Sequence, residues 1–377
     1  MRFPFLRTKA AARESGPPAA RVPVWATPVA DGAGGYAGQV RSAFLANPVA
    51  SRAIRLVAEG AGGAPIISNP AGHPALALLA SCGFGASGPG LIETMAGHLL
   101  LHGNAYIDVA LGKDGLPAAL FALRPERVSV EVDANGWPTA HVYRAGGALR
   151  RYPVGAGGGL LHIRSFHPLD DHQGAGCLAP AAGAVAVHNE ATRWNQALLA
   201  NAARPSGALV YQPGDGSTLS PTQYERLRSE MEAAFSGAAN AGRPMLLEGG
   251  LSWQALSLSP AEMDFAGMRE AAARDIALAL GVPPLLLGLK GDNTHANYRE
   301  ANVALWRLTL LPLLGRMLGA LAAHLAWWWP GLCLAVDRDA ISALAEDRER
   351  LWASVTAADF LEATEKRRIL GLEGDLA

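Results

Sequence analysis

The sequence has few charges and very little lysine. Charged residues make up 17% of its 377 residues, and the formal net charge is −1. Only four residues are lysines, Lys9, Lys113, Lys290 and Lys366, and the other cationic residues are arginines. The composition therefore lacks the basic excess that is typical of proteins that grip nucleic acid through its phosphates.

Cysteines are scarce and lie far apart. Cys82, Cys177 and Cys333 have neither disulfide nor metal-site spacing. They are predicted to be small buried apolar residues in a reducing cytosol. The first residues contain early arginine and lysine but no apolar run after them, which excludes a secretory signal. Residues 1–40 are predicted to form a flexible arm rich in Pro, Ala and Arg, with a transit-like segment as the alternative.

One stretch lacks charge altogether. Residues 317–336 contain no Asp, Glu, Lys or Arg, and their length would span a bilayer. Pro330 interrupts the stretch, and Arg316 precedes it on the same helical pattern. We therefore predict a buried helix that runs into a strand. A membrane-attached assembly protein is the alternative.

The first part of the chain is predicted to be an α+β unit. Helical patterns run from Pro48 to Gly60 and from about Gly90 to Leu101, where Gly103 stops the second helix. Alternating or β-branched runs follow at residues 105–111, 118–123, 127–132 and 141–146. The first 165 residues thus read as helices followed by one antiparallel sheet.

Long helices with marked starts and stops dominate the rest. A helix begins at Leu178, with a predicted apolar stripe of Val187, Ala191, Trp194, Leu198 and Ala202. Capping boxes at Ser220–Gln223 and Ser259–Glu262 start two more helices, the second ending at Gly281. Short strands lie between them, around residues 248–250.

A further long helix follows. Asn297, with Glu300 three residues on, is predicted to start it, and the helix runs to about Leu325. Pro312 should kink it, since proline cannot donate the internal hydrogen bond. A small charged helical segment ends the chain.

Motifs for nucleotide or acyl chemistry are missing. No run has four residues between two glycines followed by Lys-Ser or Lys-Thr, so a nucleotide P-loop is excluded. In GASGPG, residues 85–90, Pro89 stands where a nucleophile elbow needs its second glycine. This segment is predicted to be a turn before a helix.

Two polar clusters leave alternatives open. His167, Asp170, Asp171 and His172 offer metal-ligand atoms, but adjacent residues cannot all point at one ion, so a surface loop is predicted. A metal-dependent hydrolase that uses the His167 to His172 cluster is the alternative. The predicted sheet also carries arginines that could meet phosphates or acidic neighbours, Arg124, Arg127, Arg144, Arg150 and Arg151.

The order of elements resembles a known family. The segments LLHGNAYIDV, LLHIRSFHPLDDHQGAGCLAP, WNQALLANAARPSGALVYQ and DIALALGVPPLLLGLKGDNTHANYRE look like the portal proteins of tailed phages. They match best the compact portals of long-tailed phages and of phage-derived gene transfer agents. The resemblance covers about residues 40 to 370 and is most specific from 195 to 300.

The resemblance implies a fold and a domain plan. Portal proteins form a ring of twelve subunits, and the fold is α+β with a wing, a two-helix stem, a clip, a long kinked helix and a crown. Laid onto this chain, residues 1–40 stay a flexible arm. The other expected units are the wing (41–165), the first stem helix with its lead-in (166–203), the clip (204–258), the second stem helix (259–281), the tunnel-loop region (282–297), the long kinked helix with its return to the wing (298–339) and a small crown (340–377).

The resemblance also implies a function without catalysis, cofactor or metal. The chain would be a portal, the head-to-tail connector at one capsid vertex, forming the channel for DNA packaging and ejection. Its implied partners are copies of itself, expected as a dodecamer, double-stranded DNA, the terminase large subunit, head-tail adaptors and the major capsid protein, with no membrane. It would be assembled in the bacterial cytoplasm and reside in a virion or gene transfer agent particle.

Two sets of residues carry this expectation. The DNA-channel tunnel loop would contain Lys290, Gly291, Asp292, Asn293, Thr294 and His295. The clip would dock partners through Gln212, Tyr224, Arg228, Glu248 and Trp253. Near-zero net charge suits a channel in which DNA slides, because each neutralised phosphate adds salt-sensitive affinity.

Overall fold

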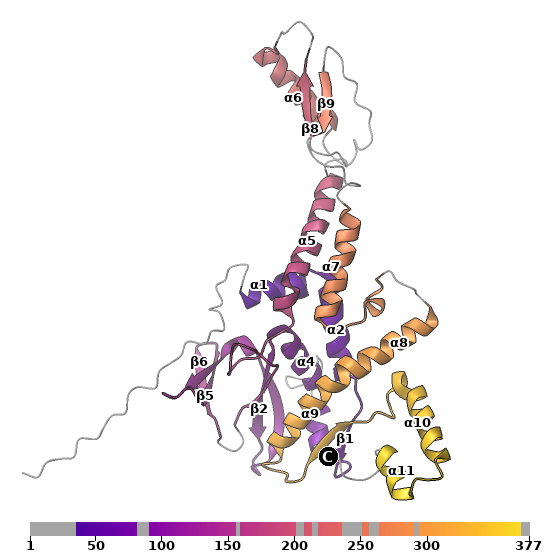
Figure 1. The fold of residues 1–377 in the computed structure, drawn as a ribbon. Helices are drawn as coiled ribbons and strands as arrows, with labels where there is room; N and C mark the ends of the chain where they lie inside the picture. The colour runs from indigo at the N-terminus through magenta and orange to yellow at the C-terminus, as the bar shows by residue number, and fades with distance from the viewer. Residues whose placement is uncertain are drawn as a thin grey trace, which may run out of the picture.

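The computed structural model describes residues 35–80, 90–155, 159–200, 207–212, 218–235, 251–255, 264–289 and 294–370. A broad body carries two adjacent helices, and a small unit of strands and one helix lies at their far end (Figure 1). The body contains helices α2 (Pro48–Gly62), α4 (Leu91–His102) and α9 (Leu311–Leu325). Their buried side chains form one continuous apolar core.

Strands of the body form separate small sheets rather than the single predicted sheet. β2 (Asn104–Leu111) lies between β3 (Pro117–Leu123) and β7 (Leu161–Arg164), and β5 (Pro138–Ala145) lies between β4 (Val128–Val132) and β6 (Ala148–Pro153). All pairs are antiparallel. Turns with left-handed glycines, Gly115 and Gly136, connect β2 to β3 and β4 to β5, as predicted.

A third pairing joins distant parts of the chain. β1 (Ile66–Asn69) pairs antiparallel with β10 (Cys333–Val336), with Ile66 opposite Val336. The short helix α3 (Ala75–Ala80) follows β1. Residues after α9 are thereby fixed beside those after α2.

Glycines allow α4 to meet a loop at backbone distance. Gly103 ends α4 in the left-handed conformation, as predicted, and its carbonyl accepts a 2.8 Å hydrogen bond from Ser165 N. The amide of Cys177 donates to Leu100 O at 2.8 Å. A Cβ on Gly176 would lie 2.6 Å from Leu101 O, so a side chain there would force the two segments apart.

The long helix begins earlier than predicted. α8 (His295–Leu305) is capped by Thr294, whose side chain accepts from Asn297 N at 3.2 Å, so the prediction that Asn297 starts the helix was wrong. Asparagine is on average a better N-cap than threonine, so intrinsic preference favoured Asn297 over the Thr294 cap that the structure has.

A π-helical segment lies directly before Pro312, where the long helix was predicted to kink. Residues Trp306–Leu310 have π-helical geometry. They join α8 directly to α9, so the helix is continuous from His295 to Leu325. Proline lacks the N–H that would bond the carbonyl of Leu308, and the wider turn accommodates its ring.

The charge-free stretch 317–336 is a buried helix followed by a strand, as predicted. α9 ends at Leu325, and β10 begins at Cys333. Within the described residues one helix, Ala296–Leu325, is long and apolar enough to cross a membrane by length and composition. Its apolar face is part of the core, where Leu314, Met317 and Leu318 are fully enclosed.

Both ends of the described chain are helical. The predicted flexible arm included residues 36–40, but these form α1 (Tyr36–Val40), which continues as a π-helical turn, Arg41–Leu45. The ring of Tyr36 packs edge-on against His102 at 4.7 Å. The C-terminal segment folds as α10 (Ala345–Ala357) and α11 (Ala363–Leu370), confirming its helical prediction.

Asn47 links α2 to the first of the two adjacent helices, α5 (Leu178–Ala200). It is 1% exposed, and its Oδ1 accepts from Val49 N at 3.0 Å and Ala50 N at 2.9 Å. Its Nδ2 lies 3.1 Å from His188 Nδ1 and donates to Asn189 Oδ1 at 2.9 Å.

Replacing Asn47 with alanine should destabilise the body. We expect a loss of about 2 to 3 kcal/mol in unfolding free energy, because the cap is lost and buried partners are left unpaired. Asn47→Asp keeps the cap acceptor and should cost less. Urea unfolding of both variants measures the difference, and equal stability of Asn47→Ala and the parent would contradict the role of this amide.

Candidate functional site

Two antiparallel helices carry the small terminal unit. α5 packs along α7 (Phe265–Ala279) (Figure 1). At their far end the rings of Trp194 and Phe265 stack at 4.0 Å. α7 buries mainly small residues with Ile276, namely Ala272, Ala273 and Ala277. Small side chains let the two helices approach closely.

The apolar stripe predicted for α5 is partly wrong. Val187 is 47% exposed, whereas Val185, His188 and Ala191 are buried. Leu198 and Ala202 have no described side chains. The polar His188 belongs to the buried face because Asn47 pairs with it, and this contact joins residues 141 positions apart.

The second of these helices begins later than predicted. α7 starts at Phe265, where the side chain of Asp264 accepts from Gly267 N at 3.1 Å. The predicted capping box Ser259–Glu262 lies outside the described residues. The predicted end is confirmed: Gly281 has a φ of 64°, and Val282 N donates to Ala277 O at 2.9 Å, the pattern of a Schellman motif.

The described residues of the small terminal unit form one helix and two strands. β8 (Gly207–Tyr211) pairs antiparallel with β9 (Leu251–Ala255) beside α6 (Pro221–Phe235). The capping box that was predicted for α6 is confirmed, because Gln223 N donates to Ser220 Oγ at 3.3 Å and Ser220 N to Gln223 Oε1 at 2.9 Å.

The predicted docking residues fall on this unit. Gln212 follows β8 and is exposed, and Tyr224 and Arg228 lie one helical turn apart on the exposed surface of α6. Trp253 lies on β9 opposite Leu209. Glu248 lies outside the described residues. Their roles remain predictions.

A short polar loop separates α7 from the long helix. It follows the 3-10 turn Pro284–Leu287 and Gly288, which has a φ of 72°. Thr294 caps α8, and His295 is its first residue. Lys290, Gly291, Asp292 and Asn293 lie outside the described residues.

The base of this loop is fixed to the long helix. Thr309, in the π segment, donates its hydroxyl to Gly281 O at 2.6 Å. A Cβ on Gly281 would lie 3.0 Å from Thr309 Oγ1, so glycine serves both the left-handed turn and the close approach. The end of α7 and the π segment therefore form one joint.

The cluster at residues 167–172 forms a structured loop. The carboxylate of Asp170 accepts from His172 N at 2.7 Å and Gln173 N at 2.8 Å, which closes a turn. Across the described residues, no group of three or more His, Cys, Asp or Glu side chains could hold a metal ion. The loop prediction is confirmed, and nothing favours the hydrolase alternative.

Two half-buried histidines contact the fully buried Asn104 in the body. Asn104 Oδ1 accepts from His162 Nε2 at 2.9 Å and from Gly174 N at 2.8 Å, and its Nδ2 donates to His102 Nδ1 at 3.0 Å. Because His102 Nδ1 accepts from Asn104 Nδ2, the His102 ring is neutral with its proton on Nε2, whereas His162 carries a proton on the Nε2 that donates to Asn104. Burial lowers the pKa of His162 to about 3 and the pKa values of His98 and His102 to about 4.

Most arginines of the sheets meet acidic or polar neighbours rather than forming an anion site. Arg150 pairs with Asp108 at 2.6 Å, Arg151 with Glu131 at 2.7 Å and Arg124 with Glu126 at 2.7 Å. Arg144 donates to Ser129 Oγ at 2.9 Å. The acidic-neighbour alternative is therefore confirmed for these pairs.

The sequence is similar to a protein family and to individual proteins that are described as phage portal proteins. A family model described as phage portal protein matches residues 48–371. An uncharacterized protein of Rickettsia felis is 37% identical over 341 residues, covering 88% of each chain. A probable portal protein of Streptomyces phage phiC31 is 28% identical over 58% of this chain and 48% of its own length.

Solved structures are similar over nearly the whole chain. In the neck of a native gene transfer agent particle, computed with C12 symmetry, a chain is 46% identical with a TM-score of 0.69, covering 89% of this chain and 93% of that one. A HK97-family phage portal protein from Corynebacterium diphtheriae shares 17% identity and a TM-score of 0.55 over 80% of this chain and 97% of its own, which supports the fold alone.

Acid should weaken the fold through its buried histidines. Above pH 6.5 these rings are neutral in folded and unfolded chains alike. Below it the unfolded chain takes up protons that the folded chain refuses until about pH 3 to 4, so stability falls over that window. Over that window, each such histidine lowers the free energy of unfolding by up to about 1.4 kcal/mol for each pH unit of acidification.

Unfolding midpoints measured from pH 7.5 to 4.5 check this expectation. His162→Gln should flatten the pH dependence, and His167→Gln, whose ring lies on an exposed loop, serves as the control. Equal pH dependence in the parent and His162→Gln would show that His162 does not carry the effect.

Proposed function

Because the chain belongs to the phage portal protein family, we propose that it forms the ring-shaped connector between head and tail at one vertex of a particle. The observation that carries this proposal is the 46% identity, over 89% of this chain, to a chain in the neck of a gene transfer agent particle. That neck was computed with C12 symmetry, which supports twelve copies here. The protein is structural, and its particle is proposed to be a virion or a gene transfer agent.

Exposed apolar side chains support assembly. Phe166 is 84% exposed and Leu169 is 91% exposed, and both lie on the loop that the carboxylate of Asp170 holds in place. Large apolar side chains on an ordered loop are typical of surfaces that another chain covers. In a ring, the neighbouring subunit supplies that cover.

The units of the fold can be assigned to the domains of a portal protein. We propose α5 and α7 as the stem, the α6–β8–β9 unit as the clip, the sheets with α2 and α4 as the wing and α10 with α11 as the crown. The exposed clip residues Gln212, Tyr224 and Arg228 are the proposed docking points for the terminase large subunit and for head-tail adaptors. The major capsid protein would surround the ring, and assembly would take place in the bacterial cytoplasm.

The loop before α8 is the proposed contact with double-stranded DNA. Its residues, Lys290, Gly291, Asp292, Asn293, Thr294 and His295, carry mixed charge. Mixed charge limits phosphate neutralisation, so passing DNA is not held strongly. The Gly281–Thr309 joint gives the loop a fixed base.

Purified protein should form rings of twelve subunits, with a mass of roughly 470 kDa for twelve 39.3-kDa chains. Mass photometry gives the subunit number, and negative-stain class averages show the ring. A preparation containing only monomers or dimers would overturn the proposal, and another closed ring number would overturn the dodecamer alone.

Replacing residues 290–293 by Gly-Ser-Gly-Ser should leave rings intact and lower the amount of DNA that particles retain. Thr294 is kept because it caps α8. Nuclease-protected DNA per particle, measured in the producing host, is the readout. Lys113→Ser, which removes an exposed lysine from the β2–β3 turn, is the control, and unchanged DNA content in the loop variant would count against the loop's role.

A further inference from the structure

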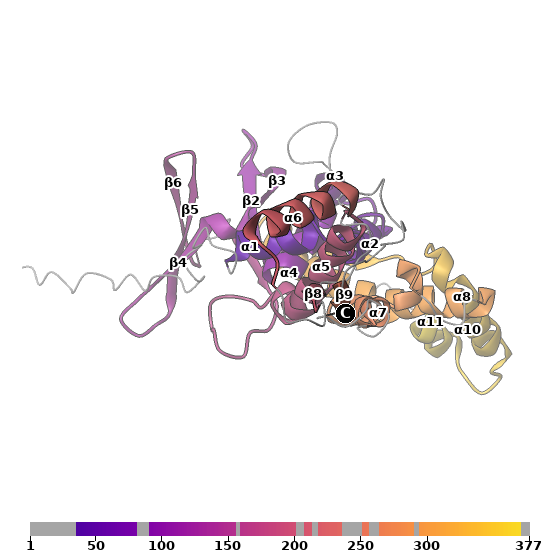
Figure 2. The ribbon, with the colours of Figure 1, turned by 90° about the horizontal axis from the view of Figure 1, so that it is seen from above.

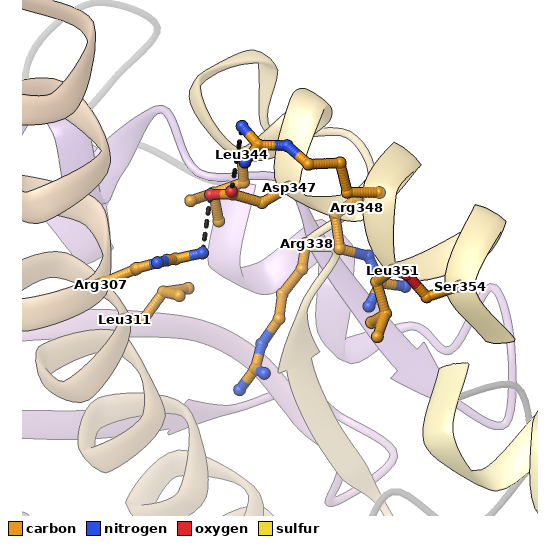
Figure 3. Close-up of a pocket in the computed structure, with 9 residues that line it drawn as sticks. Arg307, Leu311, Arg338, Leu344, Asp347, Arg348, Leu351 and Ser354 are labelled. Carbon is orange, nitrogen blue, oxygen red and sulfur yellow. Dashed lines mark hydrogen bonds and ion pairs between the residues drawn. The ribbon is translucent and has the colours of Figure 1, made fainter.

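A cavity of about 510 Å³ lies between the long helix, the segment after β10 and α10 (Figure 3). Four arginines line it, Arg307, Arg338, Arg348 and Arg350. Leu311 and Leu351 contribute apolar surface to the same cavity. Such a combination suits a ligand that carries both carboxylate and aliphatic groups.

Positive charge exceeds negative charge around this cavity. Asp347 is shared between Arg307 at 2.7 Å and Arg350 at 3.8 Å. Glu346 is likewise shared between Arg350 at 3.7 Å and Arg299 at 2.9 Å. Arg338 is exposed, and it makes no ion pair with any residue that the structure describes. The site therefore has capacity for additional carboxylates.

The end of the described chain is held at this cavity. Arg348, which pairs with Asp339, also donates from Nη2 to the carbonyl of Leu370 at 3.1 Å. Leu370 itself is buried. The next residues in the sequence, 371–377, read GLEGDLA and contain Glu373 and Asp375 between Leu372 and Leu376.

We propose that residues 371–377 dock into this arginine cavity. Glu373 and Asp375 meet the guanidinium groups that the local carboxylates leave in excess, and the two leucines cover Leu311 and Leu351. A seven-residue segment reaches about 25 Å when extended, which is enough to cross the cavity from its rim. The inference does not depend on the proposed portal function.

Tethering favours this occupant over a diffusing anion. A short covalent link gives the acidic residues an effective concentration of about millimolar at the cavity. The docked segment would also neutralise an arginine-rich surface that could otherwise attract DNA phosphates. The consequence is an arginine cluster whose positive charge is offset by carboxylates of the same chain.

Hydrogen–deuterium exchange of the full-length assembly tests the proposal. Amides of residues 371–377 should exchange about tenfold more slowly than in a free GLEGDLA peptide. Arg338→Gln should remove this protection, and so should the double variant Glu373→Gln/Asp375→Asn. Arg193→Gln, on α5 and paired only locally with Glu190, is the matched control and should leave it unchanged.

Two results would overturn it. One is free-peptide exchange of residues 371–377 in the parent protein. The other is equal protection in the parent and both variants, which would place the segment elsewhere. A 30-bp DNA duplex is then added to each protein: stronger DNA protection of residues 338–354 in the double variant supports the segment as occupant, and equally strong protection in the parent identifies DNA as the ligand instead.

Discussion

Burial of one apolar helix face organises the body. The long helix from α8 through α9 places Leu310, Leu314 and Met317 against α2 and α4, where they are completely enclosed. The approach is close: a Cβ on Gly60 of α2 would lie 3.2 Å from Leu310 Cδ1. Because core atoms are packed at near-crystalline density, this contact fixes where the long helix enters and leaves the body. The β1–β10 pair, the polar loop and the helices α10 and α11 are all positioned by those two ends.

Local signals in the sequence identified elements that depend on neighbouring residues alone. Ser220 with Gln223, Gly103 and Gly281 marked helix ends correctly because capping uses side chains and backbone within one turn. The start at Thr294 was missed because two residues could cap the same helix. Division of the strands into separate sheets depends on long-range packing, which periodicity does not report.

The candidate sites divide in the same way. Resemblance and spacing located the polar loop and the small terminal unit, since each lies between clear helix boundaries. They missed the arginine cavity, because Arg307, Arg338 and Arg350 come from different elements and have no motif. They also missed the network around Asn104, which contacts His162 from a position 58 residues earlier. Asn104 and His162 come into contact only because β2 pairs with β7.

The π segment at Trp306–Leu310 also has a genetic consequence. A π turn holds one residue more than the α-helical turn it replaces, so loss of a single codon there could restore regular α geometry. Such a deletion would leave α8 and α9 with nearly the same relative rotation, because the π turn and the α turn that replaces it cover almost the same arc. A deletion in the regular helix on either side has no extra residue to remove, and it would rotate everything beyond it by about 100° and turn the polar loop with it. The π segment is therefore the point at which the long helix can lose one residue and keep both the same core and the same direction for the loop.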